Sequence, residues 1–413
     1  MKIYKISTTA LSTNFPALTH KNFRIYWLGQ CVSLIGTWAQ SIGQAWLVLS
    51  LTGSPLLLGI LGATQFLPIT IFSLFAGVIV DRYPKKQIVL ISQFTSMILA
   101  FTLSALVFTN TVSYAYILIL ALILGFSNTL DIPSRQAFTI ELAGKKDLMN
   151  AIALNSATFN LARIIGPAIG ALIMASFGAA WCFLLNGLSF MAVIASLLKV
   201  EVPPHVKKNV SDNNMLKEIK DGLKYMVGEP ALLQTILMVF IIGIFVFNFN
   251  ILIPVFTKNI LHQEAQIYGF LMSALGVGSL VGALMVSVKS KSGPNMKILL
   301  RSSIMVSLML ILISFTRTYY YTAILLVITG VFNLWFTTTA NSTLQITTKN
   351  EYRGRVMSVY SLVFVGATPI GNLFAGLTTD MFGANTSFLL SGVSTIVLIT
   401  LLRLFFKLRQ APG

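Results

Sequence analysis

The sequence predicts an all-α integral membrane protein whose twelve transmembrane helices form two six-helix repeats. The first observation is composition: 55% of the 413 residues are hydrophobic and 10% are charged, which is far too apolar for a soluble chain of this size. The second is a repeat, because Phe177-Gly178-Ala179 recurs in the other half of the chain as Phe382-Gly383-Ala384. Each copy belongs to the last long apolar segment of its half, so both halves are expected to end in the same kind of helix.

The apolar segments are about 18 to 28 residues long, which suits a hydrocarbon core of about 30 Å at 1.5 Å per helical residue. Six fall in the first half of the chain, at 23–50, 56–80, 87–108, 112–140, 149–176 and 181–199. Six follow in the second half, at 231–257, 265–288, 298–316, 319–345, 356–377 and 384–406. These twelve segments are the predicted spans.

The expected domains are an N-terminal bundle at 1–199, a cytoplasmic linker at 200–229 and a C-terminal bundle at 230–413. The linker breaks the apolar pattern with Pro203-Pro204 and then carries an amphipathic run from Met215 to Met226, which predicts a helix along the membrane surface. The other loops are short and leave no room for a nucleotide-binding domain. A gradient is therefore expected to supply the energy.

The net charge of +17 is better explained by membrane topology than by nucleic-acid binding. If the N-terminus is cytoplasmic, all but three of the 29 lysines and arginines fall in cytoplasmic segments, the exceptions being Lys258, Arg317 and the intramembrane Arg163. The opposite orientation would invert this distribution, so both termini are predicted to lie in the cytoplasm. The first twenty residues lack the apolar region of a cleavable signal, so the first span is expected to remain as a membrane helix.

The loop between the second and third spans carries a charged motif made of Gly77, Asp81, Arg82, Lys85 and Lys86. Asp81 stands at a helix end, where a carboxylate can face the positive N-terminal end of a neighbouring helix. The basic residues can pair with other cytoplasmic charges, and such contacts can hold one conformation. Together with Arg353 and Arg355 at the start of the eleventh span, the motif predicts a conformational gate.

This motif resembles the loop signature of the major facilitator superfamily. In the fifth span, Gly166, Pro167 and Gly170 are similar to the antiporter signature of the superfamily, which favours exchange over uptake. Small residues at this spacing also let helix backbones pack closely. Residues 131–138, 160–167 and 353–358 resemble the bacterial branch that holds enterobactin exporters, macrolide efflux proteins and lysophospholipid transporters.

The resemblance covers essentially the whole chain. It implies the major facilitator fold and the export of an amphipathic small molecule, siderophore-like or antibiotic-like, across the bacterial inner membrane by alternating access. A lysophospholipid flippase of the same fold and a non-transporting membrane receptor are the alternatives.

Asp131 is the only acidic residue that the sequence places deep in a span. A lone charge at that depth costs a few kcal/mol or more unless it is paired, so Asp131 is a functional candidate. Arg135 lies one helical turn away, and Arg163 on the adjoining span is the other potential partner. Burial favours the neutral acid whereas an arginine favours the carboxylate, which predicts proton coupling at these three residues. A static ion pair is the alternative. Coupling through the arginine that drug/proton antiporters of this superfamily carry in the fourth span is excluded, because no arginine lies among Leu118–Leu124.

Polar and aromatic residues recur at helical spacing in the first, seventh and tenth spans. They are Gln30, Thr37, Trp38 and Gln44 in the first, Asn248 and Asn250 in the seventh, and Asn333, Trp335, Thr337 and Asn341 in the tenth. In the superfamily that the chain resembles, spans one, four, seven and ten line the central pathway, so these residues are expected to line a substrate cavity. Hydrogen bonding between helices is the other interpretation for part of them.

Catalytic and metal-binding patterns are missing from the predicted spans. His20, His205 and His262 lie outside them, and Cys31 and Cys182 form neither a metal spacing nor a disulfide framework. An enzyme is therefore not expected, nor a cofactor, a metal or a nucleic-acid partner. The expected partners are a small amphipathic substrate, membrane lipid and protons, and the protein is expected to be a monomer.

Overall fold

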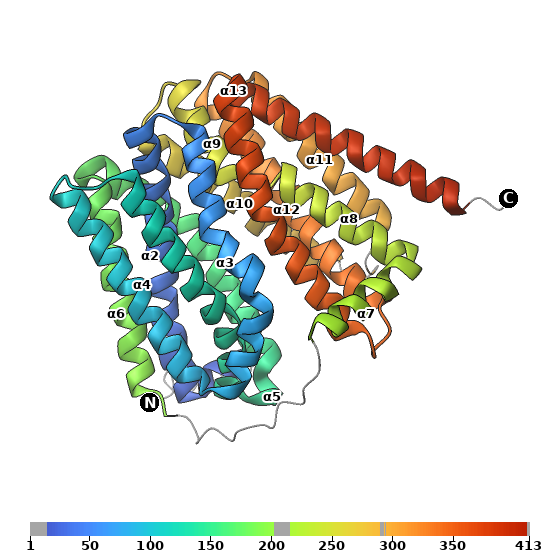
Figure 1. Ribbon diagram of the computed structural model, residues 1–413, viewed down its shortest axis with the longest axis horizontal. Helices are drawn as coiled ribbons and strands as arrows, with labels where there is room; N and C mark the ends of the chain where they lie inside the picture. Colours follow the sequence, from blue (N-terminus) through green and yellow to red (C-terminus); the bar gives the residue numbers. More distant parts are fainter. Residues whose placement is uncertain (1–14, 202–214, 290–292, 294, 411–413) are drawn as a thin grey trace, which may run out of the picture. The chain divides into compact units, whose positions relative to one another are not determined.

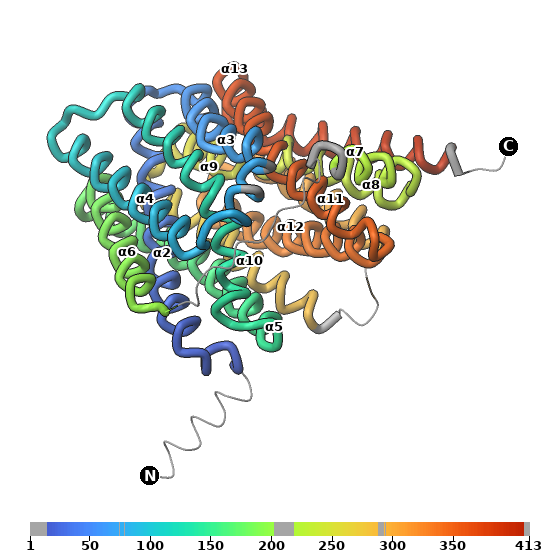
Figure 2. The backbone as a smooth tube through the Cα atoms, turned by 60° about the horizontal axis from the view of Figure 1, so that its bottom comes forward, coloured from blue at the N-terminus to red at the C-terminus, as the bar shows by residue number. Residues whose placement is uncertain are grey.

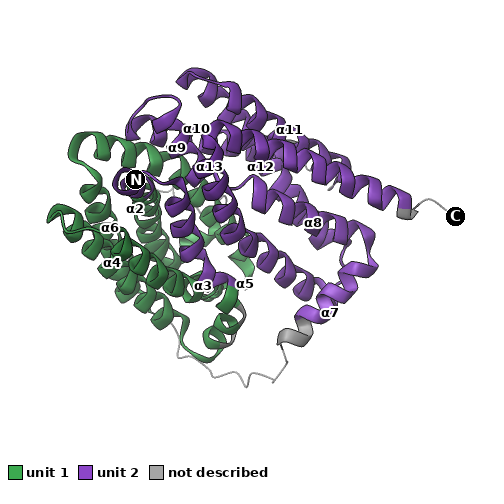
Figure 3. Ribbon diagram, turned by 45° about the horizontal axis from the view of Figure 1, so that its top comes forward, with its two compact units in different colours: residues 1–44, 71–210 green, residues 45–70, 211–413 purple. Residues whose placement is uncertain are grey.

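A computed structural model describes residues 15–201, 215–289, 293 and 295–410, and every regular element in these ranges is helical (Figure 1). The linker residues Pro203, Pro204 and His205 lie outside the described ranges. The chain divides into two compact units (Figure 3). Unit 1 holds residues 1–44 and 71–210, and unit 2 holds residues 45–70 and 211–413.

The first half of the chain forms a short 3-10 helix and five α-helical elements. They are η1 (Pro16–Thr19), α2 (Lys21–Thr52), α3 (Pro55–Arg82), α4 (Lys85–Phe108), α5 (Tyr114–Phe177) and α6 (Ala179–Lys199). The long α5 is two helices joined at Gly144, whose φ of 70° and ψ of 165° are not helical. A positive φ of this kind is accessible to glycine at little cost, so the chain can turn there without a loop.

The second half begins with the amphipathic helix that the sequence predicts in the linker. Its elements are α7 (Met215–Gly228), α8 (Pro230–Phe245), α9 (Phe249–Asn259), α10 (Ala265–Lys289), α11 (Met296–Phe315), α12 (Tyr319–Thr347) and α13 (Arg353–Gln410). Like α5, α13 is two helices, joined here at Gly383 with φ 82° and ψ 162°.

The twelve predicted spans are confirmed. In the described part of the chain, nine stretches are long and apolar enough to cross a membrane, with α8 and α9 forming one of them. Two of the nine, α5 and α13, hold two spans each. The remaining span is α2, whose 32 residues are long enough to cross but carry the polar stripe of the first span.

The duplication is visible in the geometry of the two halves. Gly178 has φ 88° and ψ 173°, and its repeat partner Gly383 adopts nearly the same conformation, so each half turns into its last helix on an equivalent glycine. Just after each turn, Phe183 and Phe388 are fully buried. Within unit 1, α6 lies beside α4 (Figure 2). Within unit 2, the second segment of α13 lies against α11, where Gly392 faces the carbonyl of Ser307.

The seventh span differs from the sequence expectation of one continuous helix at 231–257. It is broken between Phe245 and Phe249 into α8 and α9. The Asn248 side chain donates from Nδ2 to the carbonyl oxygen of Ile244 at 2.6 Å, which is the acceptor that a continuous helix would give to the backbone N–H of Asn248. Gly371 of α13 lies against the break, where a Cβ would meet Asn248 Oδ1 at 2.7 Å. The amide side chain thus stabilises the unwound turn.

Candidate functional site

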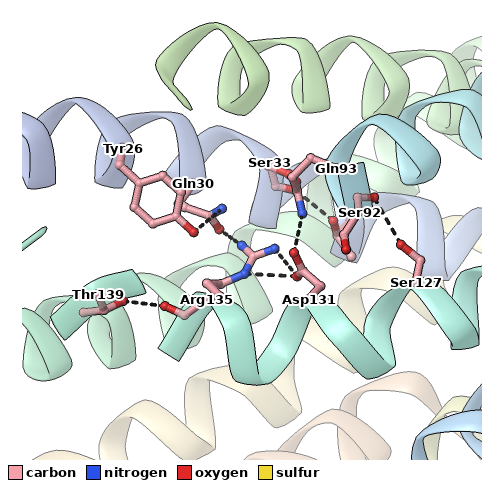
Figure 4. Close-up of polar contacts among 10 residues, drawn as sticks. Tyr26, Gln30, Ser33, Ser92, Gln93, Ser127, Asp131, Arg135 and Thr139 are labelled. Carbon is pink, nitrogen blue, oxygen red and sulfur yellow. Dashed lines mark hydrogen bonds and ion pairs between the residues drawn. The ribbon is translucent and has the colours of Figure 1, made fainter. Parts of the chain in front are cut away.

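Asp131 and Arg135 form a hydrogen-bonded ion pair on the first segment of α5 (Figure 4). Arg135 donates from Nε to Asp131 Oδ2 at 3.1 Å, and its Nη2 donates to the same oxygen. The Asp131 side chain is 8% exposed and that of Arg135 is 27% exposed. Of the two partners that the sequence offers for Asp131, Arg135 is the one in contact.

Two glutamines from neighbouring helices complete this network. Gln93 on α4 donates from Nε2 to Asp131 Oδ1 at 3.1 Å. Gln30 on α2 accepts from Arg135 Nη1 through its Oε1, and its Nε2 donates to the hydroxyl of Tyr26 at 3.2 Å. The ion pair therefore links α2, α4 and α5 through polar bonds on the inside of the unit.

The pairing explains how two charges are tolerated at this depth. Both Asp131 oxygens accept hydrogen bonds, and the guanidinium reaches two acceptors on different helices. A buried pair of this kind is a weak source of net stability, but removing one partner costs about 3–5 kcal/mol because the other charge stays buried. Any event that neutralises Asp131 would change the polar bonds among three helices together.

Arg163 lies apart from this network, in the second segment of α5. It is partly buried, and among the described residues it has no hydrogen-bond or ion-pair partner. One turn further on, Gly166 and Gly170 pack against the backbone of α2, where a Cβ at Gly170 would lie 2.8 Å from Ala39 Cα. Pro167 between them is buried. This close approach holds the second segment of α5 against α2.

The other polar residues of the first span differ in their surroundings. Thr37 is exposed, and its hydroxyl donates to the carbonyl of Ser33 on the same helix. Trp38 is partly buried and packs edge-on against Phe159 of α5, with ring centroids 5.8 Å apart. Gln44 is buried. The exposed and aromatic members of this set suit a substrate surface, whereas Gln30 is engaged by the ion pair.

In unit 2 the predicted cavity residues lie on α12 and at the break between α8 and α9. Asn248 is buried at that break, whereas Asn250 is exposed. On α12, Asn333 is buried, and Trp335 donates from Nε1 to the carbonyl of Gly282 on α10 at 3.2 Å. The next members of the stripe are partly buried: Thr337, whose hydroxyl bonds to its own helix, and Asn341, which accepts from Gln345.

The charged motif of the predicted gate lies in unit 1, around the end of α3 and the start of α4. Asp81 and Arg82 are exposed in the last turn of α3, and Gly77 lies one turn earlier. Lys85 begins α4 and pairs with Glu141 of α5 at 3.9 Å. Lys86 donates to the carbonyl of Val200 at 2.8 Å, so both lysines anchor the motif within the unit.

The two arginines of the gate lie at the start of α13 in unit 2. Arg353 donates from Nε to the carbonyl of Gln345 at 3.1 Å. Arg355 pairs with Asp221 of α7 at 3.7 Å and lies over the ring of Tyr352. That ring stacks on Tyr225 of α7, with centroids 4.3 Å apart, so the linker helix is docked on the first turn of α13.

Two residues of the network were not predicted from the sequence: Gln93 on α4, which donates to Asp131, and Tyr26 on α2, which accepts from Gln30. A signal was present for Gln93, because it is an uncharged polar residue in the middle of an apolar span, close to Ser92 and Ser96. Tyr26 carried no comparable signal, because a tyrosine near the end of a membrane helix is common at the membrane interface.

The fold and its intramembrane charges define a membrane transporter of the major facilitator superfamily. In the described part of the chain, no group of three or more histidine, cysteine or acidic side chains is placed to hold a metal ion. The sequence matches the profile of the transmembrane secretion effector family over residues 12–412. The chain belongs to this family, and it is a multi-pass membrane protein.

Curated relatives of the chain are exporters and transporters. It is 28% identical to the staphyloferrin A transporter of Staphylococcus aureus over 88% of this chain and 90% of the relative. It is 27% identical to the multidrug efflux pump Tap of Mycolicibacterium fortuitum over 86% and 88% of the two chains. The enterobactin exporter EntS of Shigella flexneri is 25% identical over 95% of each chain. The chain thus falls in the branch that its motifs resemble.

Solved structures share the fold. A mutant of the nucleoside transporter NupG superposes with a TM-score of 0.79 at 12% identity, covering 94% of this chain and 99% of that one. A D-xylose-proton symporter superposes with a TM-score of 0.73 at 14% identity, covering 92% and 96%. Both support the twelve-helix major facilitator fold.

Proposed function

We propose that the protein is a proton-coupled secondary exporter of an amphipathic small molecule, siderophore-like or antibiotic-like, that works by alternating access. The observation that carries the proposal is the Asp131–Arg135 pair, an ionisable pair held at membrane depth by polar bonds to α2 and α4. Ionisable residues inside a membrane protein are characteristic of proton pathways. Support for export comes from two relatives, which are named as a multidrug efflux pump and an enterobactin exporter.

Protonation of Asp131 supplies the conformational step. The neutral acid no longer attracts the guanidinium, so the bond between Arg135 and Asp131 weakens. Arg135 then keeps its hydrogen bond to Gln30 of α2 and is hydrated by water. The polar links from α5 to α4 and α2 then change together, and the helices are released to shift against one another. A proton that enters from outside and leaves inside can drive the reverse movement of the substrate.

The substrate is proposed to contact the polar and aromatic residues of α2, α12 and the α8–α9 break. The break itself supports this assignment, because discontinuous membrane helices expose backbone groups that transporters use to bind substrates. The gate at Asp81, Arg82, Arg353 and Arg355 is proposed to hold one access state through helix-terminus charges.

The remaining features of the proposal follow from topology and family. Both termini lie in the cytoplasm because the basic residues concentrate on that side. The protein works as a monomer in the bacterial inner membrane, binds lipid only as its solvent, and catalyses no covalent chemistry.

Gradient-driven flux in proteoliposomes tests the coupling. Proteoliposomes are prepared with an acidic interior, and dansylated amphiphiles are added outside. Uptake by the protein molecules whose cytoplasmic side faces outward corresponds to export, and it is followed with and without a protonophore. We expect uptake by the wild-type protein that the protonophore abolishes. Asp131→Asn should lose the gradient-driven uptake but keep exchange at equal pH, and Glu264→Gln, an exposed acid in the loop before α10, is the matched control.

Two results would contradict the proposal. Proton-driven uptake retained by Asp131→Asn would leave Asp131 a structural residue. Movement of lysophospholipid, with no flux of small solutes, would replace the exporter by the flippase of the same fold.

A further inference from the structure

Arg163 is a second intramembrane cation whose counter-charge is not found among the described residues. It lies midway along the second segment of α5, and a charge at this depth costs a few kcal/mol or more unless it is paired. Asp131 does not pair with Arg163, because the two oxygens of its carboxylate accept hydrogen bonds from Gln93 and Arg135.

The other described acids of unit 1 lie at the ends of helices. They are Asp81, Glu141, Asp147 and Glu201, of which Glu141 pairs with Lys85 and Asp147 pairs with His20 at 2.7 Å. None of them is placed at the depth of Arg163. The membrane interior of the described part of unit 1 therefore carries one positive charge that its own side chains leave uncompensated.

The face of α5 that carries Arg163 is open on one side and closed on the other. Toward the cytoplasmic end of the segment, Ile152, Ser156 and Phe159 occupy the same face and are exposed. Beyond Arg163, Gly166 and Gly170 on this face are buried against α2. Arg163 thus lies where an accessible surface ends.

The opposite face of the same segment is apolar and exposed at Leu161, Ile165 and Leu172, as expected of a surface that faces lipid. A serine within the exposed Arg163 face, and an arginine at its end, do not suit lipid contact. The Arg163 face is better suited to a solvent-filled passage.

An aromatic pair lies one turn before Arg163 on the same face of α5. The ring of Phe159, one turn before Arg163, packs against the indole of Trp38, with centroids 5.8 Å apart and planes at 67°. The Cβ of Trp38 lies beside Gly166, so its side chain extends along α5 past the turn that holds Arg163. Trp38 is partly buried and Phe159 is 47% exposed, so the face of α5 that carries Arg163 also presents an apolar surface one turn away.

We propose that Arg163 binds an anionic group of the exported molecule while Trp38 and Phe159 contact its apolar body. The assignment rests on the proposed export function and adds a substrate class to it, an amphipathic organic anion. A guanidinium presents several donors in a plane that match a carboxylate or a phosphate. A small carboxylate and an anionic lysolipid share this chemistry, and the open cytoplasmic half of the face favours the small solute.

Binding to the full-length protein in nanodiscs tests the proposal without relying on flux. The probes are dansylglycine, which carries a carboxylate, and dansylglycinamide, its neutral counterpart with the same body. Dansyl fluorescence is measured against empty nanodiscs. We expect the wild-type protein to prefer the anion, and Arg163→Gln to bind it about ten- to a hundredfold more weakly while binding the amide unchanged.

Controls separate binding from folding. Arg163→Lys keeps the charge and should retain part of the preference, and Arg403→Gln removes an exposed cation near the end of α13 and should change nothing. If Arg163→Gln fails to fold, the Arg163→Lys variant tests the proposal instead. An arginine with only a structural role would leave the ratio of anion to amide affinity in Arg163→Lys at the wild-type value, whereas a binding role predicts a lower ratio.

Three outcomes would overturn the assignment. One is equal affinity of the wild-type protein for the two probes, and another is a preference for the anion that survives Arg163→Gln. The third is displacement of dansylglycine by lysophosphatidylglycerol at lower concentration than by unlabelled carboxylates, which would give the subsite to a lipid headgroup. Failure of the export proposal is distinct from all of these, because it would show as absent gradient-driven flux in vesicles.

Discussion

Substitutions in the Asp131–Arg135 pair should affect stability unequally, because the two side chains differ in exposure. Arg135→Met leaves Asp131, whose side chain is 8% exposed, with a single hydrogen bond from Gln93. We expect this variant to lose about 3–5 kcal/mol, the usual cost of an unpaired buried charge. Asp131→Asn leaves Arg135, which is 27% exposed and still bonded to Gln30, so water can hydrate it and the loss should be about 1–3 kcal/mol.

The assay is unfolding of the purified protein in detergent. The wild-type protein, the two single variants and the double variant, which carries both Asp131→Asn and Arg135→Met, form a double-mutant cycle. The double variant has no buried charge at this site, so it should recover most of the loss seen in Arg135→Met.

Two results would contradict the expected difference between the variants. Equal losses in the two single variants would show that exposure does not set the cost. An additive double variant would show that the two charges do not interact, in spite of their contact.

Three further predictions concern topology, helix packing and the linker helix. In a cysteine-free background, a cysteine at Lys145 should be protected from an impermeant reagent in intact cells and one at His262 should react, and the reverse would invert the orientation. Gly278→Val should cost at least about 1–3 kcal/mol in detergent unfolding, because a side chain there meets a backbone carbonyl of α12, while Gly354→Ala, with open space around it, should be neutral. Tyr225→Ala removes the ring stack that docks α7 on α13 and should speed hydrogen exchange in α7 about fivefold, whereas unchanged exchange would mean that the stack contributes nothing.

The arrangement of helices could be predicted from the sequence because it depends on periodic and local signals. Apolar segments of membrane length gave twelve spans, and the repeated Phe-Gly-Ala sequence placed equivalent turns at Gly178 and Gly383, where the backbone adopts matching positive φ values. The break in the seventh span was not predicted. It depends on a side chain, Asn248, that replaces a backbone donor, and on the fit of Gly371 against that turn, neither of which has a sequence period.

The partners of the deep charges were predictable only in part. Spacing alone made Arg135 a neighbour of Asp131, since residues four apart share a helix face. Spacing could not decide between Arg135 and Arg163 as the partner of Asp131. A contact between Asp131 and Arg163 depends on how the two segments of α5 fold back on one another at Gly144. To predict the hydrogen bonds of Gln93 and Gln30, one must know which faces of α4 and α2 pack against α5. The composition of an apolar helix does not determine which of its faces packs against a neighbour.

The two charged positions of α5 also suggest how proton and substrate could influence one another. Asp131 lies on the segment before Gly144 and Arg163 on the segment after it, and α2 contacts both, through Gln30 near the first and through Trp38 and Ala39 near the second. An anion bound at Arg163 would favour one position of α2 on the second segment, and a proton at Asp131 would release α2 from the first. If both events shift the position of α2, they are coupled, and thermodynamic linkage requires each to change the affinity for the other by the same factor. A dansylglycine affinity that is independent of pH in the wild-type protein, or that keeps its pH dependence in Asp131→Asn, would show that α2 does not couple them.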